Sequence, residues 1–210
     1  MPSLPTFRGN PWSQPLSLDR LRQHGMGAFF RPSELRVLGV RSDQLRTLVQ
    51  EGTVERVGRG LYRLTEAETT EDYSLAAVCA RVPESIVCLL SALQVHDIGT
   101  RVPAEVWLAI PHKARAPRLP EVRVRIVRFS GAAWTYGIVA TSFEGVPARI
   151  TSPARTVVDC FRYERLVGRE TALEALYDGL RQKKVTTDSL YRTLEMLPSR
   201  RLRAALEAMP

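Results

Sequence analysis

The sequence predicts an α+β protein of two domains. Two short helical patterns joined by a glycine lie within residues 27–52, and a strand, a tight turn and a second strand follow directly at residues 54–64. Strand and helix patterns are mixed in the rest of the chain, which ends in a helical segment. Helix, turn, helix and hairpin in this order outline a winged helix-turn-helix. We therefore expect such a domain at residues 1–66, followed by a mixed α+β domain at residues 67–210.

The helices of the first domain are marked by their start and stop signals. A short helix is expected at residues 16–23, and a second begins at Pro32 and Ser33, with Ser33 as its cap, and ends at Gly39. Ser42 is expected to cap a third helix. The apolar stripe of this third helix consists of Leu45, Leu48 and Val49.

The opposite face of the third helix and the following hairpin carry side chains suited to DNA. In a helix-turn-helix the second helix of the motif enters the major groove, where Gln pairs with adenine and Arg with guanine. The hairpin turns at Gly58-Arg59-Gly60 and forms the wing, which adds arginines for the phosphate backbone. The predicted DNA-binding residues are Arg41, Ser42, Gln44, Arg46, Thr47, Gln50, Arg56, Arg59 and Arg63.

The charge of the chain is basic and unevenly distributed. Thirty Lys and Arg against 22 Asp and Glu give a formal net charge of +8, which favours a polyanionic partner. Residues 1–64 carry ten arginines and five acidic residues, residues 65–100 one arginine and six acidic residues, and residues 101–128 seven basic and two acidic residues. Positive charge is therefore concentrated in two zones. Only three of the basic residues are lysines, a bias that a GC-rich genome would also produce.

The second basic zone contains a possible secondary contact. The strand pattern at residues 122–129 alternates apolar residues with arginines, and further arginines lie on the loop before it. This set reads either as the solvated face of a sheet or as a contact to DNA or to an acidic or RNA-bound partner. The residues in question are Arg115, Arg118, Arg123 and Arg125.

Several function classes find no support in the sequence. The three cysteines lack CxxC spacing and the three histidines are scattered, so no metal site, disulfide framework or cofactor is expected. No run of about 20 apolar residues is present, and no secretory signal precedes the first helix. We expect a soluble cytoplasmic protein without a membrane partner.

The second domain combines helices with strands. An apolar helix is expected after Asp72 and another at residues 86–95, and Ser152 with Pro153 opens a further helix. Strands are expected at 105–110, 122–129, 138–143 and 148–151, and later helices around 173–180, 188–197 and 200–208.

Particular residues of both domains resemble a known family. The first domain contributes Gly39-Val40, Leu45, Val49, Gly52, Val54, Arg56, Val57 and Arg59-Gly60-Leu61-Tyr62. The second contributes Ser91-Ala92-Leu93, His96, the strand at 106–111 and the run from Ser152 to Asp159. On these motifs the chain resembles the AbiEi family, the antitoxins of type IV toxin-antitoxin operons that act in abortive infection.

The resemblance implies a function and a set of partners. Members of the family repress their own operon by binding inverted repeats in double-stranded DNA, which implies self-association on the operator, and they antagonise a nucleotidyltransferase toxin. By this resemblance, Gln44, Arg46 and Thr47 would read bases, while Arg56 and Arg59 would hold the backbone. Asp43 departs from a purely basic recognition face. It would either accept a hydrogen bond from the amino group of cytosine or stabilise the helix N-terminus.

Other function classes remain as alternatives. A plain winged-helix regulator with a ligand- or partner-sensing second domain, and a protein-interaction module that binds no DNA, are both compatible with the pattern. A catalytic role would require an activated nucleophile or a metal set, and neither is evident. Thr156 and Asp159 could form a polar cluster with Arg155, but an ion pair between Arg155 and Asp159 at i, i+4 explains the same residues. We therefore expect no enzyme activity.

Overall fold

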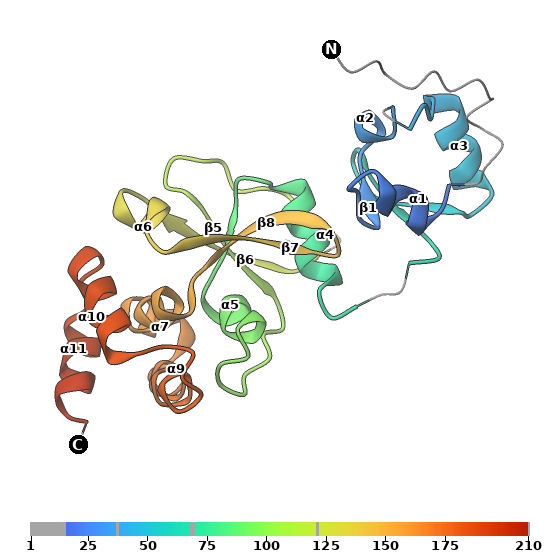
Figure 1. The fold of residues 1–210 in the computed structure, drawn as a ribbon. Helices are drawn as coiled ribbons and strands as arrows, with labels where there is room; N and C mark the ends of the chain where they lie inside the picture. The colour runs from blue at the N-terminus through green and yellow to red at the C-terminus, as the bar shows by residue number, and fades with distance from the viewer. Residues whose placement is uncertain (1–15, 37, 68–69, 121, 210) are drawn as a thin grey trace, which may run out of the picture. The chain divides into compact units, whose positions relative to one another are not determined.

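The chain folds into two compact units, which are described separately. The structure is a computed structural model that describes residues 16–209 except residues 37, 68–69 and 121. The first unit extends to Glu71 and includes Glu144–Val146, and the second comprises Asp72–Phe143 and Pro147–Pro210 (Figure 1). The predicted α+β class is confirmed. The functional boundary expected after residue 66 remains a prediction.

The first unit has the element order of a winged helix-turn-helix. Its helices are α1 (Leu18–Gln23), α2 (Pro32–Leu35) and α3 (Ser42–Gln50), and its strands are β1 (Phe29–Phe30), β2 (Val54–Gly58) and β3 (Leu61–Leu64). The three strands form an antiparallel sheet in the order β1-β3-β2. The helix pair and hairpin were expected from the sequence. The two-residue strand β1 was not, because so short a run carries no periodicity.

Local chemistry explains where the helices of the first unit begin and end. Pro32 lies at the first position of α2, where its missing N–H costs nothing, and the Glu34 carboxylate accepts from the Arg31 N–H. The N-cap of α2 is Arg31, two residues before the predicted Ser33. The N-cap of α3 is Arg41, one residue before the predicted Ser42. Gly39 has φ +75°, a conformation that allows the short turn between α2 and α3.

The second unit is a five-stranded mixed sheet with helices on both faces. The sheet has the order β6-β5-β4-β8-β7, in which β5 pairs with β6 and β4 with β8 in parallel, while β4 and β5 are antiparallel. Its strands are β4 (Ile86–Val87), β5 (Val106–Pro111), β6 (Val124–Phe129), β7 (Ile138–Phe143) and β8 (Val146–Thr151). Its helices are α4 (Tyr73–Arg81), α5 (Leu89–Val95), α6 (Ala132–Thr135), α7 (Pro153–Arg162), α8 (Glu164–Val167), α9 (Arg169–Arg181), α10 (Thr187–Met196) and α11 (Arg200–Glu207).

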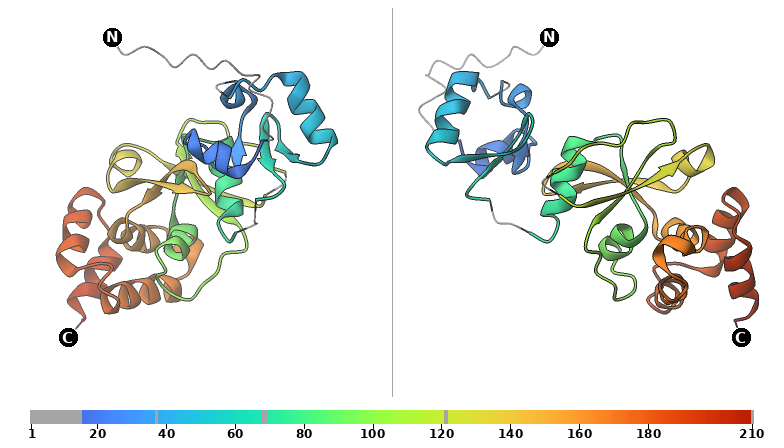
Figure 2. Two further views of the ribbon diagram at one scale, coloured as in Figure 1. Left: turned by 45° about the vertical axis from the view of Figure 1, so that its right-hand side comes forward. Right: turned by 180° about the vertical axis from the view of Figure 1, so that it is seen from behind.

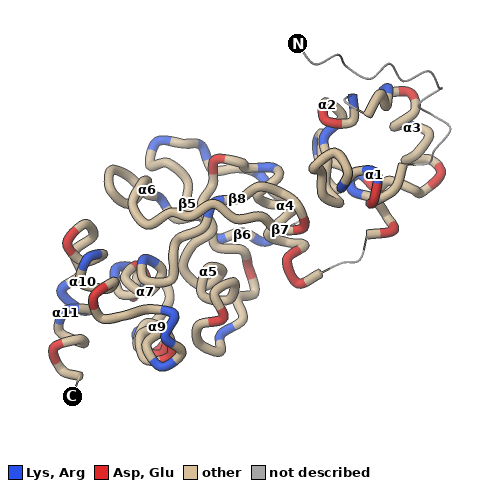
Figure 3. Tube along the Cα trace, viewed as in Figure 1, with Lys and Arg blue, Asp and Glu red and all other residues tan. Residues whose placement is uncertain are grey.

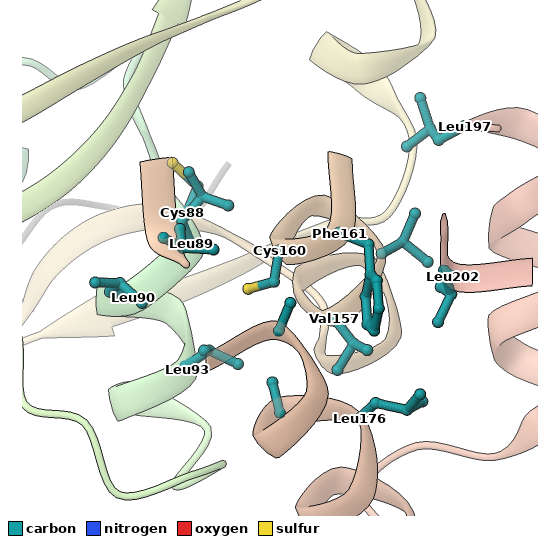
Figure 4. Close-up of a cluster of buried hydrophobic side chains, with 14 of the residues drawn as sticks. Cys88, Leu89, Leu90, Leu93, Val157, Cys160, Phe161, Leu176, Leu197 and Leu202 are labelled. Atoms are coloured by element: carbon teal, nitrogen blue, oxygen red, sulfur yellow. The ribbon is translucent and has the colours of Figure 1, made fainter. Parts of the chain in front are cut away.

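The main hydrophobic core of the second unit lies between the sheet and the C-terminal helices. Figure 2 shows α4 on one face of the sheet and α5 with α7 on the other, with α9, α10 and α11 packed beyond α7. Side chains from α5, α7, α9 and the segment around α11 meet in this core (Figure 4). Val157, Cys160 and Leu176 are fully buried there. Burial of these apolar side chains stabilises the folded second unit.

One predicted element of the second unit is wrong in part. The helix expected at residues 86–95 begins only at Leu89, and Ile86–Val87 form the central strand β4. A strand buried on both faces is a continuous apolar run, which periodicity cannot distinguish from a buried helix. Leu89 has φ +50°, so the chain changes direction between strand and helix.

Candidate nucleic-acid interface

Helix α3 presents one apolar and one polar side. Leu45 is buried against the rest of the first unit, while Leu48 and Val49 are only half-buried, so Leu45 carries most of the packing of this helix. The exposed side chains lie at spacings that bring them to one surface of a helix. They are Ser42, Asp43, Arg46, Thr47 and Gln50.

Some of the predicted base-reading residues have intramolecular hydrogen bonds. Gln44 is half-buried, and its Oε1 accepts from the Arg41 N–H at 2.9 Å, which satisfies an N–H that the helix leaves open. Thr47 Oγ1 donates to the Asp43 carbonyl at 3.3 Å. Arg46 and Gln50 are exposed one turn apart on the same surface. Arg46 and Gln50 are therefore better placed than Gln44 to contact bases.

The N-terminal end of α3 carries an exposed ion pair. Arg41 donates from Nε to Asp43 Oδ1 at 3.1 Å and from Nη2 to Asp43 Oδ2 at 2.6 Å. The hydrogen bond from Arg41 lowers the pKa of the Asp43 carboxyl, and the same contact raises the pKa of Arg41. Ser42, between them, is the first residue of α3 and not its cap.

The wing is the hairpin of β2 and β3. Gly58 pairs with Leu61, so Arg59 and Gly60 form its two-residue turn, and Gly60 has φ +68°, a conformation that glycine adopts without strain. Arg59 is exposed at the tip. Arg56 is also exposed, and its Nε donates to the Gly58 carbonyl at 3.3 Å, so its side chain follows the strand toward the turn.

Arg63, in contrast, is not placed to contact DNA. Its side chain is only 3% exposed. Nη2 donates to the Ala67 carbonyl at 2.6 Å, Nη1 lies 3.4 Å from Glu55 Oε1, and the guanidinium lies over the Phe29 ring. The prediction that Arg63 contacts DNA is therefore corrected. The alternation of strand β3 turns this residue toward the interior, where it ties the strand to the following segment.

The four arginines of the second predicted basic set are all exposed, and the side chain of one of them has partners within the chain. Arg115 and Arg118 are exposed on the segment between β5 and β6, whose basic positions can be followed in Figure 3. Arg123 is exposed just before β6. The side chain of Arg125 already has two partners within the chain. Its Nε donates to Glu105 Oε1 at 2.7 Å, and its guanidinium lies 5.3 Å from the centre of the Trp107 ring.

The polar cluster considered for catalysis is a buried structural network. Arg155 and Asp159 are both fully buried on α7 and pair through Arg155 Nε and Asp159 Oδ2 at 2.8 Å. Arg155 also donates to the carbonyls of Tyr136 and Ala133, and Arg162 donates to the second Asp159 oxygen. Burial raises the pKa of Asp159, while the two arginines oppose this shift.

Other candidate chemistry in the second unit is also structural. Thr156 donates to backbone carbonyls at the start of α7, and His96 Nε2 lies 2.6 Å from the Thr151 carbonyl oxygen. Burial raises the pKa of the Cys79 thiol to about 12. In the described parts of the chain no three His, Cys, Asp or Glu side chains are grouped as a metal site requires. Within the same residues no helix has the length and apolar character needed to cross a membrane.

Comparison with known proteins gives a match to a family model and a similarity to solved structures. Residues 18–65 match the family model described as "Transcriptional regulator, AbiEi antitoxin". The fold is similar to that of the RV2827C protein from Mycobacterium tuberculosis, with a TM-score of 0.57 and 18% sequence identity over 84% of this chain and 69% of that chain. No curated protein matches the sequence. The matched residues span α1 to β3, so the similarity to this family covers the winged helix and does not extend into the second unit.

Proposed function

We propose that this protein is a sequence-specific DNA-binding autorepressor and the antitoxin of a type IV toxin-antitoxin operon, where it opposes a nucleotidyltransferase toxin. The observation that carries the DNA-binding part is the exposed polar surface of α3 beside the wing. Arg46 and Gln50 lie on the helix that would enter the major groove, and Arg59 lies at the wing tip. The match of this unit to a family of regulators supports the same reading.

The proposed contacts divide into two groups. Arg46, Gln50 and the N-terminal end of α3 contact base edges, with Ser42, Gln44 and Thr47 beside them. Arg56 and Arg59 contact phosphates, because a hairpin wing lies along the backbone. Arg115, Arg118, Arg123 and Arg125 form a secondary contact to nucleic acid or to the toxin. The protein acts by binding and not by catalysis, since the polar groups of α7 are occupied by one another.

A titration of the full-length protein tests DNA binding. The probe is the duplex upstream of its own gene, compared with a scrambled duplex of equal composition over a series of salt concentrations. We expect tighter binding to the upstream duplex and an affinity that falls steeply with salt, by a slope of about 0.9 per phosphate contacted. Arg165→Ala, an exposed arginine on α8, serves as the charge-matched control for Arg46→Ala. Equal affinity for both duplexes at every salt concentration would disprove sequence-specific repression.

The antitoxin role is tested in cells. If the neighbouring gene encodes a nucleotidyltransferase, its expression should arrest growth, and expression of this protein beside it should restore growth. The family match is confined to residues 18–65, which favours a plain regulator with a partner-sensing second unit as the alternative. A neighbouring gene of another kind, or a toxin that this protein does not neutralise, would support that alternative.

A further inference from the structure

The exposed pair of Arg41 and Asp43 has a geometry that its structural role does not require. Both oxygens of the Asp43 carboxylate accept from one side of the Arg41 guanidinium, at 3.1 and 2.6 Å. The two side chains are 72% and 63% exposed. An ion pair so exposed contributes little to folding stability. Its position at the start of α3 is the position from which a recognition helix contacts base edges.

Asp43 lies in the first turn of α3, where a carboxylate stabilises the helix N-terminus, and backbone hydrogen bonds at Asp43 and Gln44 contribute to its lowered pKa. The N-cap of α3 is Arg41, and the open N–H of Arg41 is satisfied by Gln44. A carboxylate that receives two hydrogen bonds from a guanidinium is also a poorer acceptor for the amino group of cytosine. Asp43 also fixes the orientation of Arg41, a long side chain that otherwise has many rotamers.

The pairing leaves one side of the guanidinium available. An arginine has five N–H donors, and Asp43 takes the Nε donor and one donor of Nη2. The remaining donors of Nη1 and Nη2 include two that are parallel, at the end of the side chain. Two parallel donors fit the O6 and N7 acceptors of guanine in the major groove.

The net charge of the Arg41–Asp43 pair argues for a contact to a base edge and against a contact to phosphate. Arg41 and Asp43 together carry no net charge, so the pair releases few counterions and gains little from a phosphate. Its directional hydrogen bonds are retained. We infer that Arg41 reads a guanine base edge and that Asp43 is the residue that positions it. This inference rests on the proposed DNA binding.

The inference predicts that Asp43→Asn changes the affinity for random duplex and the preference for guanine in opposite directions. Asp43→Asn removes a negative charge and loosens Arg41, so it should tighten binding to random duplex while reducing the preference for guanine at one position. Arg41→Ala should abolish that preference, which for a bidentate contact is about tenfold. Asp43→Glu, which keeps the charge and both oxygens, should retain more of the preference than Asp43→Asn. Glu51→Gln is the matched control, since it removes an exposed negative charge at the other end of α3.

The experiment uses the full-length protein and a duplex pool with randomised sequence. Each variant selects its preferred sequences from the pool, and its affinities for the selected and a random duplex are then titrated at several salt concentrations. We expect Glu51→Gln to tighten random binding slightly and to select the same guanine as wild type. Replacing that guanine by 7-deazaguanine, which lacks the N7 acceptor, should weaken wild-type binding but not that of Arg41→Ala.

The outcomes separate the inference from the proposed function. A wild-type protein that selects no sequence would overturn both. Selection by wild type that is unchanged in Arg41→Ala and Asp43→Asn would overturn the inference alone. If Arg41→Ala weakened all duplexes equally and lowered the salt slope, Arg41 would contact phosphate, and the guanine reading would be wrong. If Asp43→Asn weakened random and selected duplexes alike, with a lower melting temperature, Asp43 would be merely structural.

Discussion

The two units of this protein use the same pair of residue types in opposite ways. In the second unit Arg155 and Asp159 are 0% exposed, and the other guanidinium nitrogens of Arg155 donate to backbone carbonyls. In the first unit Arg41 and Asp43 are mostly exposed, and only one side of the guanidinium is occupied. A buried arginine with its donors satisfied holds a fold together. An exposed arginine with free donors is available to a partner.

The largest effect should come from breaking the buried pair. Arg155→Met leaves Asp159 buried with Arg162 as its remaining partner, and removal of one member of a buried ion pair costs about 3 to 5 kcal/mol of unfolding free energy. The loss extends to the backbone carbonyls of Ala133 and Tyr136 and to the contact of Arg155 with the Phe129 ring. Urea unfolding of the full-length protein measures this change.

The control for this prediction is an arginine in the same region without buried contacts. Arg165→Met on α8 alters an exposed side chain and should change the unfolding free energy by less than about 0.5 kcal/mol. A loss below about 1 kcal/mol for Arg155→Met would contradict the view that the Arg155 network organises the second unit.

A second prediction concerns the apolar side of the recognition helix. Leu45→Ala should reduce the unfolding free energy of the first unit by about 2 to 5 kcal/mol, because it leaves a cavity beneath α3. Leu48→Ala should cost less, since Leu48 is only half-buried. Melting curves of the two variants provide the comparison. Equal losses would mean that the helix packs through both residues.

The difference between Leu45 and Leu48 also shows what sequence patterns can and cannot predict. Periodicity placed Leu45, Leu48 and Val49 on one stripe of α3, which is correct, but burial depends on what packs against each position of that stripe. The same limit applies to Arg63, since alternation along β3 shows that it faces one side of the sheet but not which side is covered. The hairpin with Arg59 at its turn was predictable because two glycines define it locally.

The second unit was predictable to a similar degree. The i, i+4 spacing of Arg155 and Asp159 predicted their pairing, which the structure confirms. Strand β4 was mistaken for helix because both of its faces are covered by other elements. The role of Arg125 depended on Glu105 and Trp107, which lie about 20 residues earlier in the sequence and are brought beside it by strand pairing. Contacts of this kind have no local signal.

The third prediction distinguishes residues that read bases on α3. Arg46→Ala removes an exposed donor group and should cost about 1 to 3 kcal/mol of binding free energy at the operator, with relaxed preference at one base pair. Gln44→Ala should affect base preference less, because its Oε1 is already bonded to the Arg41 N–H. Operator duplexes with single base-pair substitutions measure both. A larger loss of preference in Gln44→Ala would assign the reading to Gln44.

The smallest effect is expected at the wing, where the contact is to the backbone and not to bases. Arg59→Ala should weaken operator and random duplex alike and lower the salt slope by about 1, because one phosphate contact is lost. Arg63→Gln is the matched control: it removes the same charge from the same strand pair, but the side chain is buried, so stability should fall while the salt slope stays unchanged. Titrations of both variants against both duplexes over a salt series test this difference. If Arg59→Ala altered base preference while Arg46→Ala bound like wild type, the wing and not α3 would be the element that reads the sequence. Exposed arginines of the hairpin, and not those of α3, would then make the specific contacts.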